Sequence, residues 1–151
     1  MTDSPDAFTH AWFGEFRRAR TELGAGEVLE HDWYIGNVVV DGAEIEVMIG
    51  TGDPVRARAL LPDLEDVVGT FAALARTASD AVVTEFGGAE TAPEEFDDAA
   101  QDLRVSTIEV REDGTVVLHL EDTCGQHFLD GYWPAVSLSA EREVLEVSVE
   151  A

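Results

Sequence analysis

The sequence predicts an α+β fold in which helices pack on one face of a mainly antiparallel sheet. Short strands with alternating apolar residues fall into two hairpin groups, one before and one after a helical middle. Asp41-Gly42 separates two of these strands as a tight hairpin turn would. In the middle, apolar residues recur at intervals of three and four. This order of strands, helices and strands is typical of α+β folds.

The length and composition predict one domain that covers residues 1–151, with polar residues 1–7 disordered. A hydrophobic content of 45% supplies a core. The N-terminal residues lack a signal-peptide pattern, and no apolar run is long enough to span a membrane. Cys124 is the only cysteine, as a cytosolic protein would show. We therefore expect a cytoplasmic protein with no membrane partner.

Residues 8–23 fit two patterns. A helical stripe would consist of Phe8, Trp12, Phe16, Ala19 and Leu23. One face of a strand would instead consist of Trp12, Gly14 and Phe16. We favour a strand near residues 11–18, and in either case we expect the aromatic side chains to be buried.

The next segments form a hairpin and then helices. Residues 35–40 and 43–49 are the hairpin strands, and the second strand turns Ile45, Val47 and Ile49 inward. Asp53 is placed to cap a short helix that ends near Pro62. A principal helix is expected over residues 63–86, and a shorter amphipathic helix over 94–103.

Four strands close the chain. Each alternates apolar and polar residues, so one face should be buried and the other exposed to water. We expect them at residues 106–110, 115–120, 134–138 and 145–149.

Charge limits the classes of partner. The chain has 32 acidic and 9 basic residues, a net charge of −23, and every basic residue is arginine. Such a charge excludes a nucleic-acid binder and disfavours anionic membranes. Three explanations stay open: a GC-rich genome, a high-salt habitat, and an acidic face that binds a basic partner. Salt should relieve the internal repulsion.

Potential metal ligands lie close together in the sequence at His119, Asp122, Cys124 and His127. Zinc binds such nitrogen and sulfur donors, but strong structural sites have paired Cys or His elements. The alternative is a strand carrying His119 followed by a connection. We therefore expect no cofactor, with His119, Cys124 and His127 as weak metal candidates. Cys124 and His127 lack a nearby oxyanion nest, and no catalytic motif is present, so we expect no enzyme.

Two groups of residues are candidates for binding a protein partner. The acidic group consists of Glu94, Glu95, Asp97, Asp98 and Asp102. The aromatic group consists of Tyr132 and Trp133, which could anchor a partner. The alternatives are a solvated helix face for the acids and a core or rim position for the aromatics. A functional surface is expected at the connection 122–133 or on the acidic helix.

Residues 127–138 and 144–151 resemble a loose group of small acidic bacterial domains of unknown function. In that group an early hairpin and a helix precede a final hairpin. Its members often have a His near the start of the penultimate strand, where Tyr132 or Trp133 stands here, so no catalytic residue carries over. Some relatives resemble immunity proteins that neutralise toxins.

The leading hypothesis is thus a cytoplasmic, non-enzymatic protein-binding domain, with an immunity protein against a basic toxin domain as its specific form. The alternative from another class is a small metal-dependent hydrolase that uses His119, Cys124 and His127. In a third reading the acidity reflects only habitat or genome composition.

Overall fold

A computed structural model describes residues 6–88 and 90–151. In this part of the chain eight strands form one sheet, in which the spatial order follows the sequence order. Neighbouring strands are antiparallel, except that β4 and β5 are parallel. The predicted α+β fold is confirmed. The strands are β1 (Ala7–His10), β2 (Gly14–Glu22), β3 (Val28–Val40), β4 (Ala43–Gly50), β5 (Leu103–Arg111), β6 (Val116–Asp122), β7 (Trp133–Leu138) and β8 (Val144–Glu150).

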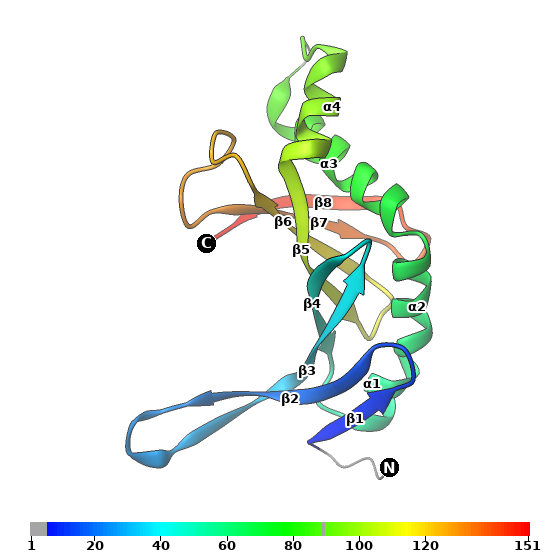
Figure 1. Cartoon of the computed structure of the whole chain (residues 1–151), viewed down its shortest axis with the longest axis vertical. Coiled ribbons are helices and arrows are strands. Elements are labelled where there is room, and N and C mark those ends of the chain that lie inside the picture. Colours follow the sequence, from blue (N-terminus) through cyan, green and yellow to red (C-terminus); the bar gives the residue numbers. More distant parts are fainter. Residues whose placement is uncertain (1–5, 89) are drawn as a thin grey trace.

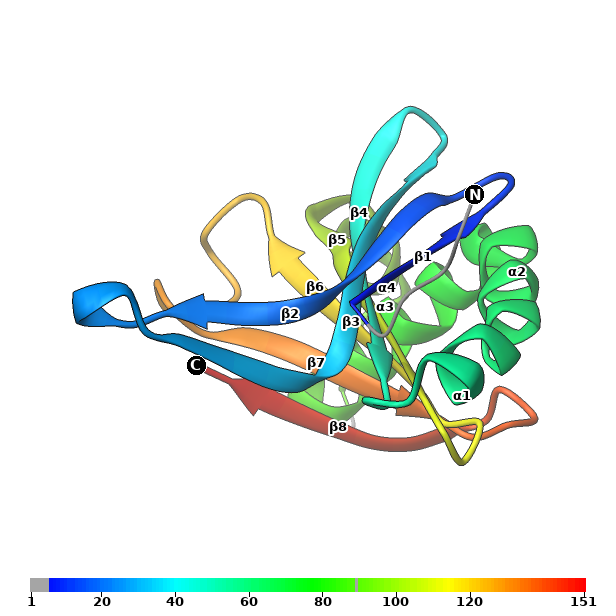
Figure 2. The same ribbon diagram turned by 90° about the horizontal axis from the view of Figure 1, so that it is seen from below.

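The helices lie between β4 and β5 in the chain and on one side of the sheet (Figures 1 and 2). Parallel neighbours require a connection that crosses back along the sheet, and the helices supply it. Within the described residues, no helix is both long and apolar enough to cross a bilayer. The helices are α1 (Pro54–Ala59), α2 (Leu61–Gly69), α3 (Phe71–Gly87) and α4 (Pro93–Asp102), and a 3₁₀ turn, η1, covers Gly24–Gly26.

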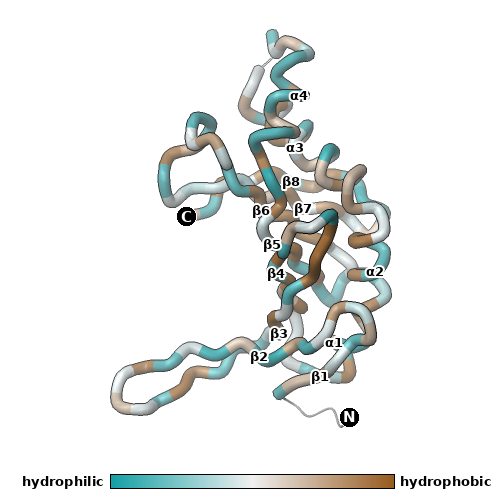
Figure 3. The backbone as a smooth tube through the Cα atoms, in the orientation of Figure 1, coloured by the Kyte–Doolittle hydropathy of each residue, from teal (hydrophilic) through white to brown (hydrophobic). Residues whose placement is uncertain are grey.

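The core fills the space between the helices and the sheet. Ile45, Val47 and Ile49 of β4 are buried, as predicted, and the hydrophobic stretch of the β3–β4 hairpin is brown in Figure 3. Strand pairing places Val47 beside Ile108 of β5, and Ile108 beside Leu118 of β6. These rows pack against buried residues of the helices, among them Leu61, Leu64, Val67, Leu74, Ala78 and Val82. Burial of these apolar rows is the main stabilising contribution.

Several local predictions are confirmed. Asp41 and Gly42 have φ values of 51° and 80°, as a hairpin turn that matches strand twist requires. The backbone N–H of Val55 donates to Oδ1 of Asp53 at 2.9 Å, so Asp53 caps α1. All four strands expected in the last third are present.

The expected helix over residues 63–86 is instead two helices. α2 ends at Gly69, and α3 begins at Phe71. Thr70 between them has φ −117° and ψ 21°, outside the helical range. Its hydroxyl donates to the carbonyl oxygen of Asp66 at 2.9 Å. Glycine and threonine are both weak helix formers, so the helix breaks where they stand together.

The N-terminal segment is a hairpin of β1 and β2. This confirms the strand for residues 14–18, whereas residues 11–13 form the turn. Phe8 and Phe16 are buried, but Trp12 lies in the turn with 78% of its surface exposed, so its expected burial was wrong. Residues 1–5 of the segment expected to be disordered lie outside the described residues, and Ala7 already belongs to β1.

β2 and β3 continue beyond the rest of the sheet as a long hairpin, whose residues 20–31 we call the arm. The arm projects to the side opposite the helices, as does the β6–β7 connection, residues 123–132 (Figure 1). Apolar residues Leu23, Val28 and Leu29 at the end of the arm are about half exposed. The side of the sheet without helices is thus flanked by two protrusions.

Gly36 of β3 leaves room for the ring of Phe16. A Cβ atom at Gly36 would lie 2.6 Å from Cδ1 of Phe16 and 3.1 Å from the carbonyl oxygen of Glu15. The Phe16 ring in turn stacks on Phe8, with centroids 5.3 Å apart. The missing side chain therefore lets the Phe16 ring lie against β3 while it stacks on Phe8.

Replacing Gly36 should therefore destabilise the fold. We expect Gly36→Ala to lower the free energy of unfolding by about 1–3 kcal/mol, because the fully buried Phe16 ring must move. Gly24→Ala is the control, since a Cβ atom there meets nothing within 4 Å; its effect should stay within about 0.5 kcal/mol. Urea unfolding measures both, and equal values for the two variants would contradict the packing described.

Candidate functional site

The β6–β7 connection is held by Asp102 and Asp122. Backbone N–H groups of His127 and Phe128 donate to Oδ2 of Asp122 at 2.8 and 2.9 Å. The backbone and hydroxyl of Thr123 donate to the carbonyl oxygen of Asp102 at 2.8 and 2.7 Å. Burial acts to raise the pKa of Asp122, but the two backbone N–H groups, together with the Cys124 thiol and the nearby His127, outweigh it and hold that pKa below its usual value. The connection is therefore folded back onto the beginning of β5.

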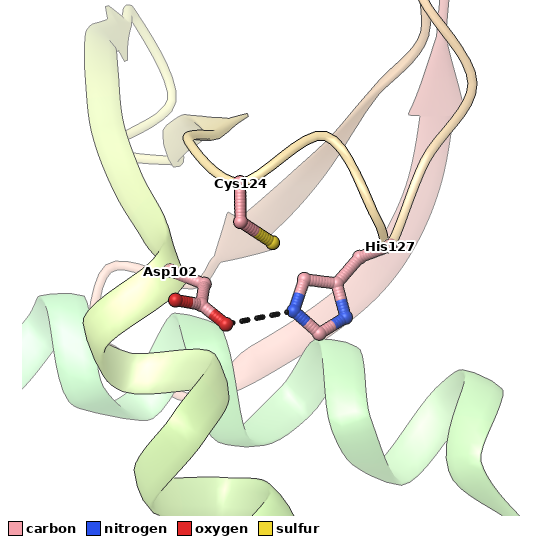
Figure 4. Close-up of side chains that lie close together, drawn as sticks. All are labelled: Asp102, Cys124 and His127. Carbon is pink, nitrogen blue, oxygen red and sulfur yellow. Dashed lines mark hydrogen bonds and ion pairs between the residues drawn. The ribbon is translucent and has the colours of Figure 1, made fainter.

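The structure separates His119 from the other metal candidates. His119 lies on β6, where its Nδ1 accepts a hydrogen bond from the indole N–H of Trp133 at 3.1 Å. Ligand atoms of Asp102, Cys124 and His127 instead lie within 4.8 Å of one another (Figure 4). The cluster therefore contains Asp102, which the sequence predicted only as a partner-binding residue, and it does not contain His119. Asp102 comes close to Cys124 and His127 because β5 pairs with β6, and the spacing of residues in the sequence does not reveal this pairing.

The Cys124 thiol is not arranged as an activated nucleophile. It donates to Oδ1 of Asp122 at 3.3 Å and is exposed. A hydrogen bond from the Gln126 backbone lowers the pKa of Cys124, but partial desolvation and the carboxylates of Asp122 and Asp102 outweigh it. The pKa of the thiol is therefore above its ordinary value, and reactivity requires the thiolate.

The acids of α4 do not form one free patch. Oδ1 of Asp97 lies 2.9 Å from Nη2 of Arg76 on α3, and Asp102 lies 3.0 Å from Nε2 of His127. Glu95 and Asp98 line a depression of about 380 Å³ between α3, α4 and the β6–β7 connection. Glu94 is exposed in the first turn. The five predicted acids therefore have different surroundings, and two of them already pair with basic or imidazole groups.

The predicted aromatics lie on another surface, the face of the sheet opposite the helices, which we call the open face. Strand pairing places two rows of residues on the open face, and each row crosses the six strands from β3 to β8. One row consists of Asn37, Glu46, Thr107, His119, Ala135 and Ser148. The other consists of Ile35, Met48, Glu109, Val117, Ser137 and Glu146. Trp133 is on this face beside Glu150, and Tyr132 precedes it with 50% exposure.

Three adjoining depressions form a groove along the open face. Their volumes are about 430, 360 and 470 Å³. The first and second share Met48, and the second and third share Ser106 and Trp133. The groove therefore runs from Trp33, near the base of the arm, to Tyr132 in the β6–β7 connection.

Carboxylates dominate the ionisable groups that line the groove. The acidic residues are Asp32, Glu46, Glu109, Glu112, Asp113, Glu121, Asp122 and Asp130. The basic residue among the lining residues is Arg111, whose Nε lies 2.6 Å from Oε2 of Glu109. The groove is thus an anionic surface with aromatic residues at both ends.

Histidines hold the two groove tryptophans. His119 accepts from the indole of Trp133, and the ring of His31 stacks on that of Trp33 with centroids 4.3 Å apart. Sequence reasoning missed Trp33, Ile35 and Met48. One signal could have found them, because they are apolar residues at the outward positions of strands whose alternate residues are buried.

Comparison of the chain with models of known protein families, with curated protein sequences and with solved structures gives no match. The candidate sites therefore rest on the geometry described above.

Proposed function

We propose that this chain is a non-enzymatic protein-binding domain that holds a basic segment of a protein partner in the open-face groove. The observation that carries the proposal is the groove itself, three adjoining depressions with eight lining carboxylates and tryptophans near both ends. Tyr132 and Trp133 keep their predicted role as anchors, joined by Trp33. The acids of α4 become secondary, because Glu95 and Asp98 line a separate depression between α3, α4 and the β6–β7 connection.

The chemistry of the groove suits lysine and arginine side chains. Aromatic faces bind such cations by cation–π contact, and carboxylates pair with them at the rim. Because His31 and His119 already fix the tryptophan rings, less side-chain entropy is lost on binding. The net charge of −23 would speed the encounter with a basic partner.

A toxin domain in the cytoplasm is the specific partner that we propose, with this chain as its immunity protein. Support comes from the sign and size of the charge, and the resemblance expected from residues 127–138 and 144–151 to small acidic bacterial domains agrees with this partner. The competing reading is that acidity reflects only habitat or genome composition. In that case the groove carboxylates should matter no more than other surface acids.

The groove predicts which substitutions weaken binding of a short arginine-rich peptide. Trp33→Ala and Trp133→Ala should each weaken it at least about tenfold, as loss of a central anchor does. Glu46→Gln with Glu121→Gln should also weaken it, and added salt should weaken binding of the unchanged protein. Isothermal titration calorimetry gives the dissociation constants.

A matched control separates the groove from general acidity. Glu94→Gln with Asp98→Asn also removes two negative charges, but it removes them from α4, away from the groove. This pair should bind the peptide nearly as the unchanged protein does. If both pairs of acid substitutions weaken peptide binding equally and the tryptophan substitutions have no effect, the groove is ruled out as the binding site. A general electrostatic effect would then explain the binding.

The immunity proposal has its own test. We expect co-expression of this chain to protect cells from a toxin domain encoded by a neighbouring gene, and the two proteins to elute together in gel filtration. Trp133→Ala should reduce protection, whereas the α4 pair of substitutions should not. Absence of both protection and a complex would overturn the immunity proposal while leaving the peptide result intact.

A further inference from the structure

Three ligand types converge at one end of the sheet, outside the functions proposed above. Asp102 ends α4, and Cys124 and His127 belong to the β6–β7 connection. Their side chains point toward one another in Figure 4, and their ligand atoms lie within 4.8 Å of one another. Oδ2 of Asp102 and Nε2 of His127 are 3.0 Å apart. An oxygen, a sulfur and a nitrogen donor thus surround one small volume.

The backbone brings these residues together. Leu103 pairs with Asp122 across β5 and β6, which sets Asp102 beside the beginning of the connection. Thr123 then binds the carbonyl oxygen of Asp102 through both its backbone and its hydroxyl. Asp122 accepts from the backbone of His127 and so turns the connection back toward Asp102. The backbone segments that carry the three donors are therefore brought together by contacts other than those between the donors themselves.

The surroundings of the three donors also suit a bound dication. Oδ1 of Asp122 lies 3.3 Å from Sγ of Cys124, where it can act as an outer partner of a metal-bound thiolate. Cys124 and His127 are exposed, which leaves access for the ion and for a solvent ligand. The high negative charge of the chain also favours cations over anions.

We propose that Asp102, Cys124 and His127 form a three-ligand site for a transition-metal dication, with Zn²⁺ as the ion that suits them best. Zinc accepts oxygen, nitrogen and sulfur donors in tetrahedral arrangement. Mg²⁺ and Ca²⁺ prefer sites built only from oxygen. Three protein donors leave the fourth position of a tetrahedral zinc ion to water, an arrangement found in exchangeable and catalytic sites. His119, a weak metal candidate from the sequence, accepts a hydrogen bond from Trp133 instead and takes no part.

The test is metal binding by the reduced full chain in excess Mg²⁺, which occupies ordinary surface carboxylates. We expect about one equivalent of Zn²⁺ to bind and to raise the melting temperature. Co²⁺ in the same site should show a thiolate-to-metal charge-transfer band that Cys124→Ser abolishes. Asp102→Asn and His127→Gln should each weaken binding at least about tenfold, the lower bound for loss of even an outer partner.

The control variant is His119→Gln, because it removes a histidine that spacing alone groups with Cys124. It should bind Zn²⁺ like the unchanged protein. The proposal is overturned if less than about a tenth of an equivalent binds, or if excess Mg²⁺ displaces all the metal. It is also overturned if Asp102→Asn has no effect while His119→Gln does. Melting curves without metal show that each variant folds.

Discussion

The parallel pairing of β4 and β5 is the constraint on which the rest of the structure depends. It joins two antiparallel groups, β1–β4 and β5–β8, into one sheet. Because parallel neighbours need a long crossover, α1–α4 must return along one face, and they bury the apolar rows there. The other face is left without a covering layer. The groove exists because this uncovered face continues from β3 to β7 across the parallel pair.

Some carboxylates of the acidic excess make contacts within the chain, and eight of them line the groove on the open face. Several arginines bind acids within the chain, such as Arg76 with Asp97 and Arg142 with Asp66. Nine arginines against 32 acids leave most of the negative charge to the surface. Exposed pairs of this kind contribute little stability. The groove differs from the rest of this surface because its carboxylates surround aromatic rings that other side chains already orient.

Local physics made much of the fold predictable from sequence. The Asp41-Gly42 turn, the Asp53 cap and the alternation in the last four strands depend on neighbours in the chain, and all were found. The break at Thr70 was missed because the apolar period continues through it. The groove and the Asp102 contact were also missed. Both follow from pairing between distant strands, which places Met48 beside Glu109 and Leu103 beside Asp122.

We propose that the open face, and not the acidic helix, is the binding surface. Backbone amide shifts in a ¹⁵N-labelled sample, recorded while a short arginine-rich peptide is added, test it most directly. We expect the largest changes in β3–β7 around Trp33, Met48 and Trp133, together with the indole N–H signals of Trp33 and Trp133, and small changes in α4. Changes concentrated on Glu94, Glu95 and Asp98, or spread evenly over all surface acids, would contradict it.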